Sequence, residues 1–292
     1  MKLINADKIK NKRMTKNYIQ WDNSGKGYGS QQDRAYFIDK KMCTVPAHRG
    51  MVKMNIVIDY IRNLFRRIEI NEVEKLQTVP IDYTKGVSIE QRCMMLGNGW
   101  TVDVIKHIFK GVEVMEKEGL TVLSLFDGIS CGHIALDRAG LKVKQYFASE
   151  IDKYAIKVTM KNYPETIQVG DITKLKGSDF PHINILMGGS PCQGFSFAGK
   201  QLNFKDPRSA LFFEFVRLLK ECNPDYFLLE NVRMKKEYQD VISGELGVEP
   251  IEINSALVSA QNRKRLYWTN IPWVTQPADK GIMLKDIIDN EL

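Results

Sequence analysis

Short apolar runs alternate with amphipathic stretches from residue 121 onward. Four runs have the length and composition of buried strands: 121–126, 144–149, 183–187 and 226–229. Helices are predicted between them over 132–139, 152–163 and 209–221, with Gly140 closing the first and Pro164 following the second. Residues 251–254 and 265–269 have the pattern of two further, paired strands. This alternation is typical of an α/β domain built on a doubly wound, largely parallel sheet.

The first 119 residues are less regular. Residues 1–50 are polar and basic and show no clear period, so an irregular region is predicted over 1–65, in which residues 1–20 fit a flexible basic tail equally well. Helices are predicted over 71–76 and 101–109, with a turn at Gly97-Asn98-Gly99 between them. A charged stretch at 111–119 has the character of a linker into the α/β domain.

Composition narrows the class of protein. A chain of 292 residues with 43% hydrophobic and 26% charged residues has enough apolar material for one catalytic domain and an accessory region. The formal net charge of +7 favours a partner with a phosphate backbone and a solvated basic surface about equally.

The sequence shows no membrane-spanning segment and no secretory signal. No apolar run is long enough to cross a bilayer, and the N-terminus lacks the apolar core of a secretory signal. The five cysteines are scattered without metal-ligand spacing. We therefore expect a cytoplasmic protein without a metal site.

Several polar residues follow the predicted strands directly. Residues 126–132 join a strand to a helix, and their glycines permit close approach of a ligand, although the spacing is not that of a dinucleotide-binding loop. Glu150 ends the next strand, where a carboxylate binds ribose hydroxyls, and Asp171 is placed to accept from an adenine amino group. Each feature alone fits an ordinary turn or a solvent-facing carboxylate. Together they favour a nucleoside-containing cofactor.

Three further features indicate nucleophilic chemistry at the same sheet edge. Cys192 lies in a glycine-flanked loop after a strand, and its polar neighbours speak against a buried structural thiol. Glu230 follows the next apolar strand, where partial burial would raise its pKa and let it act as a proton donor. Arg263 and Arg265 are expected on one face of an extended strand, either on a solvated surface or at the nucleophile.

The ordered set of motifs resembles the cytosine-C5 methyltransferase family. The resemblance covers nearly all of residues 121–272, and it rests on residues 126–132, Glu150, Asp171, Pro191-Cys192-Gln193, Glu230-Asn231-Val232 and Gln261-x-Arg263-x-Arg265. It implies a Rossmann-like methyltransferase fold that uses S-adenosylmethionine, with a small, irregular target-recognition region. The implied donor-binding residues in this part of the chain are Phe126, Asp127, Gly128, Gly132, Glu150, Ile151, Asp171, Ile172, Pro191 and Leu211.

The resemblance also implies a mechanism. Cys192 would attack C6 of a cytosine while Glu230 protonates or hydrogen-bonds N3, and Arg263 and Arg265 would hold the base and the nucleophile. Cytosine C5 needs such covalent activation to attack a methyl sulfonium, and the base must leave the duplex to be reached. The implied DNA contacts are Gln193, Ser196, Arg208, Gln261 and Arg66.

Two segments near the front of the chain resemble the last two motifs of the family. Residues 66–84 resemble the ninth motif, with Thr78-Val79 in place of the more usual Gly-Phe, and residues 91–102 resemble the tenth, which adds Asn98 and Val102 to the donor site. The motif order is therefore that of a circular permutant, which compact domains tolerate. The implied division is 1–65 for target recognition, 66–110 for the ninth and tenth motifs packed on the catalytic domain, 111–119 for a linker and 120–292 for the catalytic domain.

Other functions fit the residues less well. The first alternative is a tRNA cytosine-C5 methyltransferase of the same architecture. An inactive relative is disfavoured because Cys192, Glu230 and both arginines are present, and a dehydrogenase is disfavoured by the poor pyrophosphate loop. We expect a monomeric, bacterial or phage-type enzyme that acts on double-stranded DNA, with a cognate restriction endonuclease as a possible separate partner.

Overall fold

The computed structural model describes residues 12–21, 34–47, 56–59, 64–113, 118–191 and 207–288. The chain forms two compact units. Unit 2 comprises residues 102–254 and 264–277, and unit 1 comprises residues 1–101, 255–263 and 278–292. The predicted catalytic domain, 120–292, therefore contributes to both units.

A seven-stranded sheet forms the centre of unit 2, in the order β12-β14-β11-β10-β7-β8-β9. The strands β11, β10, β7, β8 and β9 run parallel, and β14 is antiparallel to both β11 and β12. The bounds are β7 Leu120–Leu125, β8 Val143–Ser149, β9 Ile167–Gln168, β10 Ile185–Gly189, β11 Tyr226–Val232, β12 Ile251–Asn254 and β14 Lys264–Thr269. This order confirms the predicted Rossmann-like methyltransferase fold and the pairing of the last two strands.

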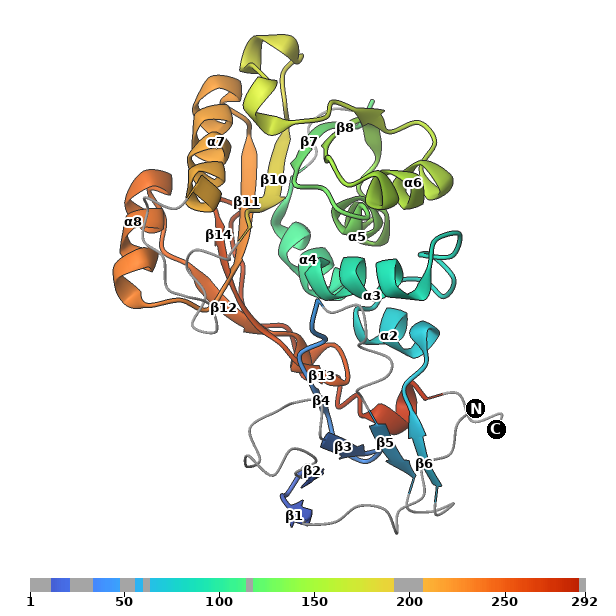
Figure 1. Ribbon diagram of the computed structural model, residues 1–292. Coiled ribbons are helices and arrows are strands. Elements are labelled where there is room, and N and C mark those ends of the chain that lie inside the picture. The colour runs from blue at the N-terminus through green and yellow to red at the C-terminus, as the bar shows by residue number, and fades with distance from the viewer. Residues whose placement is uncertain are drawn as a thin grey trace. The chain divides into compact units, whose positions relative to one another are not determined.

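Helices cover both faces of this sheet, with α7 and α8 on one face and α5 and α6 on the other (Figure 1). The helices are α4 Val102–Ile108, α5 Cys131–Ala139, α6 Lys153–Asn162, α7 Pro207–Cys222 and α8 Lys236–Leu246. Asp152 caps α6 by accepting from two backbone amides, and Gly140 ends α5 in the left-handed conformation, as predicted. Helix α8 was not predicted, although Gly247, at φ +72°, ends it in the same way.

Unit 1 contains a five-stranded sheet in the order β1-β2-β3-β5-β6. Its strands are β1 Lys12–Met14, β2 Tyr18–Trp21, β3 Arg34–Phe37, β5 Ile56–Asp59 and β6 Leu64–Arg67. The described parts of residues 1–65 thus contain short strands within the region predicted to be irregular. Strands of three or four residues are too short for apolar alternation to be visible in the sequence.

Buried ionic side chains hold the helices of unit 1, which are α2 Ile70–Leu76 and α3 Ile89–Asn98. Glu72 accepts from Arg66 and from the Glu69 backbone amide, which fixes the start of α2. Glu74, fully buried, accepts from Arg92 of α3 at 2.9 Å. Helix α3 was not predicted, and it includes Gly97 and Asn98 in place of the predicted turn. A Cβ at Gly97 would lie 2.4 Å from the backbone of Ala47, so this close approach requires glycine.

Between β12 and β14 the chain leaves unit 2 and contributes residues 255–263 to unit 1. Within this segment β13, Gln261–Asn262, pairs in parallel with β4, Met42–Cys43. The short helical turns along the chain are η3 Phe109–Gly111, η4 Ile172–Lys174, η5 Gly177–Asp179, η6 Ser255–Leu257 and η7 Leu284–Asp286.

Three features are absent from the described part of the chain. No helix there is long and apolar enough to span a membrane. No group of histidine, cysteine and acidic side chains there is arranged to hold a metal ion. The cysteines of this part of the chain, Cys43, Cys93, Cys131 and Cys222, are not joined in disulfides.

Candidate active site

The carboxyl ends of the parallel strands carry the predicted donor-binding residues of unit 2. After β7 the backbone turns through Phe126, Gly128 and Ser130, all with positive φ. A Cβ placed on Gly128 would meet no atom within 4 Å, so space lies open above this turn. Such open backbone at the start of a helix can approach a bound nucleotide or nucleoside closely.

Glu150 joins the ends of β7 and β8. One oxygen of its carboxylate accepts from the Gly128 amide at 2.8 Å, and the other accepts from the amides of Ile151 and Asp152. The Ile151 side chain beside it is 77% exposed, which is unusual for a large apolar group. A fixed carboxylate next to an exposed apolar side chain fits the ribose and the base of a nucleoside. These residues therefore fit a donor such as S-adenosylmethionine.

Asp171 follows β9 and caps η4. Its carboxylate accepts from the backbone amide and the hydroxyl of Thr173, and these hydrogen bonds hold its pKa below the usual range. The side chain of Ile172 is buried in the core of unit 2. Only the backbone of Ile172 is therefore available to a ligand, because its side chain packs under the sheet edge.

The other predicted donor residues differ in accessibility. Phe126 and Leu211 are partly buried against the core of unit 2, and Pro191 is half-buried. Gly132 lies within α5 and is buried. In the tenth-motif segment Asn98 is exposed, whereas the Val102 side chain is fully buried. Donor contacts by all of these residues stay predictions. The burial of the Val102 side chain leaves only its backbone for such a contact.

Glu230 and Arg265 form an ion pair inside unit 2. The Arg265 Nε lies 2.9 Å from the Glu230 Oε1, and only 14% and 10% of the two side chains are exposed. The sheet register produces this contact, because Glu230 pairs with Tyr267 and Arg265 lies two residues away on the same face of β14. On its other side Glu230 is in register with Gly189, near the end of β10. The predicted acid thus stands beside the strand that leads into Pro191 and Cys192.

Asn231 is a site residue that the sequence analysis did not single out. Its side-chain amide donates to the Ser190 hydroxyl at 3.0 Å and to the Ser190 carbonyl at 3.5 Å. Both side chains are buried. Asn231 therefore fixes the backbone just before Pro191. The signal in the sequence was its position directly after Glu230, within the same motif.

Arg263 differs from its expected placement. Arg263 lies between the end of β13 and the start of β14, outside both strands. It therefore does not share a strand face with Arg265. Its guanidinium is buried in unit 1 and donates to the carbonyls of Val45, Gly97 and Gly99. Three carbonyl acceptors satisfy a buried cation without a ligand. The common strand face was a wrong prediction, and the catalytic role of Arg263 stays untested.

Two predicted DNA contacts lie inside unit 1. Gln261 is fully buried, and its amide donates to Leu76 and Gln77 and accepts from the Val45 amide. Arg66 is buried against Glu72. Their burial speaks against direct DNA contact by these two side chains. Cys192, Gln193 and Ser196, and the side chain of Arg208, lie outside the described residues.

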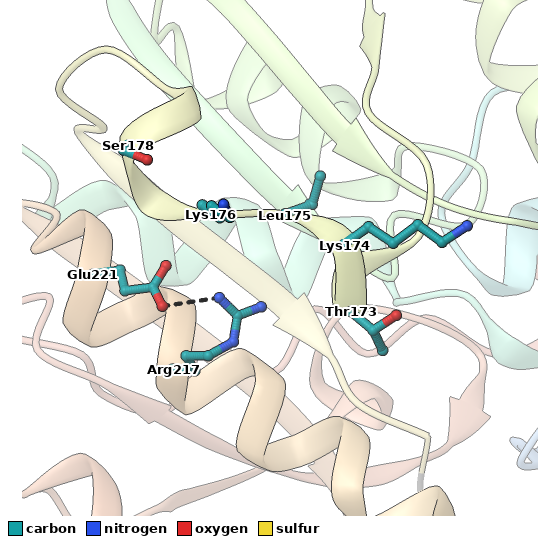
Figure 2. Close-up of a pocket in the computed structure, with 7 residues that line it drawn as sticks. All are labelled: Thr173, Lys174, Leu175, Lys176, Ser178, Arg217 and Glu221. Atoms are coloured by element: carbon teal, nitrogen blue, oxygen red, sulfur yellow. Dashed lines mark hydrogen bonds and ion pairs between the residues drawn. The ribbon is translucent and has the colours of Figure 1, made fainter.

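A surface pocket of about 580 Å³ is lined by residues that follow Asp171 in the sequence and by residues of α7 (Figure 2). On α7 the guanidinium of Arg217 forms an ion pair with the carboxylate of Glu221, one helical turn away, at 2.9 Å, and it also donates to the Ile172 carbonyl. The Gly177 amide, and then Arg217, hold the pKa of Glu221 below its usual range. The residues that line the pocket are Thr173, Lys174, Leu175, Lys176, Ser178, Arg217 and Glu221. Neither Glu230 nor Arg265 is among them. These bonds fix the 172–177 segment to α7, next to the Asp171 cap.

His133 on α5 is a buried histidine whose pKa lies below the ordinary value. Burial lowers this pKa, and the carboxylates of Asp137 and Glu165 raise it by a smaller amount. Its ring lies between the rings of Tyr146 and Tyr163, and its Nδ1 has no hydrogen-bond partner within the described residues. The folded-state pKa is below the ordinary value of 6.5, so the folded protein binds fewer protons than the unfolded chain. The stability from this neutral ring is fully present above about pH 6.5 and is lost as the pH falls below it.

We therefore expect His133→Phe to flatten the acid limb of the stability curve. Urea unfolding between pH 7.5 and pH 5 measures this, and the wild type should lose up to about 1.4 kcal/mol per pH unit more than the variant below about pH 6.5. Phenylalanine keeps a flat ring in the stack. Parallel pH curves for the two proteins would show that His133 does not contribute to acid sensitivity.

The sequence of the chain is similar to those of known methylases. The family model of the C-5 cytosine-specific DNA methylases matches residues 2–113 and 120–241. The type II methyltransferase M1.ScrFI of Lactococcus lactis subsp. cremoris is 42% identical over 157 residues, which are 50% of this chain and 40% of that protein. The orphan methyltransferase M.Rho11sI of Bacillus phage rho11s is 44% identical over 187 residues, 57% of this chain and 37% of that protein. The chain thus spans less than half the length of these two relatives.

Solved structures give a weaker likeness. A DNA modification methyltransferase encoded within an E. coli prophage matches with a TM-score of 0.44 and 27% identity, over 51% of this chain and 46% of that one. This score is too low to indicate a shared fold, so the fold assignment rests on the strand order of unit 2.

Proposed function

Because the chain belongs to the C-5 cytosine-specific DNA methylase family, we propose that it methylates C5 of cytosine in a specific sequence of double-stranded DNA. One structural observation supports this most: the buried Glu230–Arg265 pair, in register with the strand that leads into Pro191-Cys192. An acid on one strand, and a nucleophile that follows the neighbouring strand in the sequence, can act on two positions of one pyrimidine ring.

The proposed reaction uses this arrangement as follows. The Cys192 thiolate forms a bond to C6 of a base turned out of the duplex, and the ring electrons move toward C5. Glu230 hydrogen-bonds or protonates N3, which withdraws electron density from the ring, and Arg265 holds the Glu230 side chain in place. C5 forms a bond to the methyl group as the methyl–sulfur bond of the donor breaks. Solvent then takes the C5 proton, the C5–C6 double bond re-forms, and the Cys192–C6 bond breaks to release the thiolate.

S-adenosylmethionine is the proposed methyl donor. When bound, it supplies an electrophilic methyl group on a sulfonium. Glu150 would accept from the ribose hydroxyls, Asp171 from the adenine amino group, and Ile151 would contact the adenine ring. The open backbone at Gly128 and the exposed Ile151 side chain support this assignment.

The proposed architecture is a circular permutant, with the ninth and tenth motifs ahead of the first eight. The buried polar pairs of residues 66–92 support it, because Arg66–Glu72 and Glu74–Arg92 order the segment that resembles those motifs. Residues 1–65 would then recognise the target sequence. A bacterial or phage origin, and a cognate restriction endonuclease as a separate partner, are parts of the same proposal.

Methyl transfer to duplex DNA and to tRNA, compared side by side with labelled donor, tests the substrate class. We expect incorporation into DNA, and bisulfite sequencing of DNA from expressing cells should then locate the target sequence. Incorporation into tRNA alone would overturn the DNA assignment and favour the RNA enzyme of the same architecture.

A further inference from the structure

The turn after β7 is held in a conformation that its sequence does not favour. Phe126 and Ser130 have φ values of +57°, and only Gly128 between them is free of a Cβ. The left-handed conformation costs a residue with a Cβ about 1–2 kcal/mol of conformational free energy. Two such residues within five positions persist only when neighbouring contacts fix the backbone.

Asp127 supplies those contacts. Its carboxylate accepts from the Ser130 hydroxyl and, at 2.7 Å, from the Tyr146 hydroxyl, while its backbone amide donates to the Ser149 carbonyl at 3.1 Å. Burial raises the pKa of the Asp127 carboxyl, because its surroundings do not solvate the charge well. Asp127 was expected to bind the donor. Its carboxylate instead contacts Ser130 and Tyr146 and stabilises the turn.

The Tyr146 hydroxyl is itself held in place. Tyr146 is 2% exposed, and its ring stacks on His133 at a centroid distance of 4.3 Å and an interplanar angle of 12°. Tyr163 stacks on the other face of His133 at 3.9 Å. Its hydroxyl also donates to a carboxylate at 2.7 Å, but that carboxylate belongs to Asp137 on α5 and not to the turn.

We propose that Tyr146 is a positioning residue for the methyl donor, which acts by orienting the Asp127 carboxylate that holds the turn at 126–130. This inference rests on the proposed function of the chain. The connection to the donor runs through Gly128, whose amide donates to Glu150 at 2.8 Å. When the Tyr146 hydroxyl is lost, the Asp127 carboxylate keeps its bond from Ser130 but loses its side-chain anchor in β8, and only the backbone bond to Ser149 remains there. The backbone at Gly128 and the proposed ribose-binding carboxylate of Glu150 then lose their fixed relation.

Two matched variants separate this role from packing. Tyr146→Phe and Tyr163→Phe each remove one hydroxyl from one stacked ring and leave the stack intact. We expect Tyr146→Phe to weaken binding of the product S-adenosylhomocysteine about tenfold by calorimetry, in line with the loss of a hydrogen bond to a charged group. KM for the donor should rise similarly, with kcat within about twofold of wild type. Tyr163→Phe should leave both values unchanged.

Amide hydrogen exchange of the full chain without donor provides the second readout. We expect the backbone at 126–130 to exchange faster in Tyr146→Phe than in wild type or Tyr163→Phe. Faster exchange with no donor binding by any of the proteins would support the positioning role and contradict the proposed function instead. Wild-type exchange and affinity in Tyr146→Phe, or an equal loss in Tyr163→Phe, would overturn the proposal.

Discussion

Replacing Glu230 with glutamine is expected to slow methyl transfer by about 10²–10⁴-fold, the usual contribution of a positioned general acid. Glutamine keeps the length and shape of the side chain, and its amide can still hydrogen-bond a ring nitrogen. It cannot transfer a proton or carry the charge that pairs with Arg265 at 2.9 Å. Donor binding should stay at the wild-type level, because Glu230 belongs to β11 and is not among the proposed donor contacts.

Stability must be measured alongside the rate. Breaking a buried ion pair by removing one charge can cost about 3–5 kcal/mol, since the remaining guanidinium keeps its desolvation penalty. Rates should therefore be compared at a temperature where urea unfolding shows both proteins folded. A wild-type rate for folded Glu230→Gln would remove this carboxyl group from the mechanism.

Glu252→Gln is the matched control for this change. Glu252 lies on β12 of the same sheet and pairs with Lys264, the residue directly before Arg265, at 3.1 Å. Its side chain is 34% exposed, and surface pairs contribute at most about 1 kcal/mol. This variant also removes one carboxylate from the sheet, but it keeps the Glu230–Arg265 pair. We therefore expect it to methylate at the wild-type rate.

Replacing Cys192 with alanine is expected to abolish methylation and to leave donor binding intact. Without the thiolate no bond forms at C6, and C5 is not nucleophilic enough to take the methyl group. Cys192 follows Pro191 directly, and Asn231 fixes the backbone at Ser190 just before it. Labelled methyl transfer measures the loss, and calorimetry with S-adenosylhomocysteine measures the binding.

Cys222→Ala is the control for general effects of losing a thiol. Cys222 ends α7, and burial raises its pKa to about 11, so it is protonated near neutral pH and is a poor nucleophile. We expect Cys222→Ala to methylate normally. Substantial turnover by Cys192→Ala would rule out Cys192 as the nucleophile.

The architecture of unit 2 was readable from the sequence because each strand and helix has its own local pattern. Buried strands such as β7 are continuous apolar runs, and caps such as Asp152 and Gly140 mark the helix ends. Helix α3 had a comparable signal in Ser88, which accepts from the Gln91 amide, but Gly97 and Asn98 at its end were interpreted as a turn.

The burial of polar residues could not be read in the same way. Gln261 and Arg263 looked like surface residues of a basic run, and their burial depends on acceptors far away in the sequence, such as Leu76 and Val45. The break at Arg263 likewise depends on tertiary packing and not on local periodicity. In contrast, Glu230 and Arg265 were expected at one site, and the β11–β14 register brings them into contact.

The most direct test of the central claim is covalent trapping on duplex DNA that carries 5-fluorocytosine at the target position, with donor present. Fluorine at C5 cannot leave as a proton does, so the Cys192–C6 bond should persist. We predict a denaturation-resistant protein–DNA adduct for wild type and for Cys222→Ala, and none for Cys192→Ala. An actively methylating wild-type protein that forms no adduct, or an adduct formed equally well by Cys192→Ala, would contradict the account.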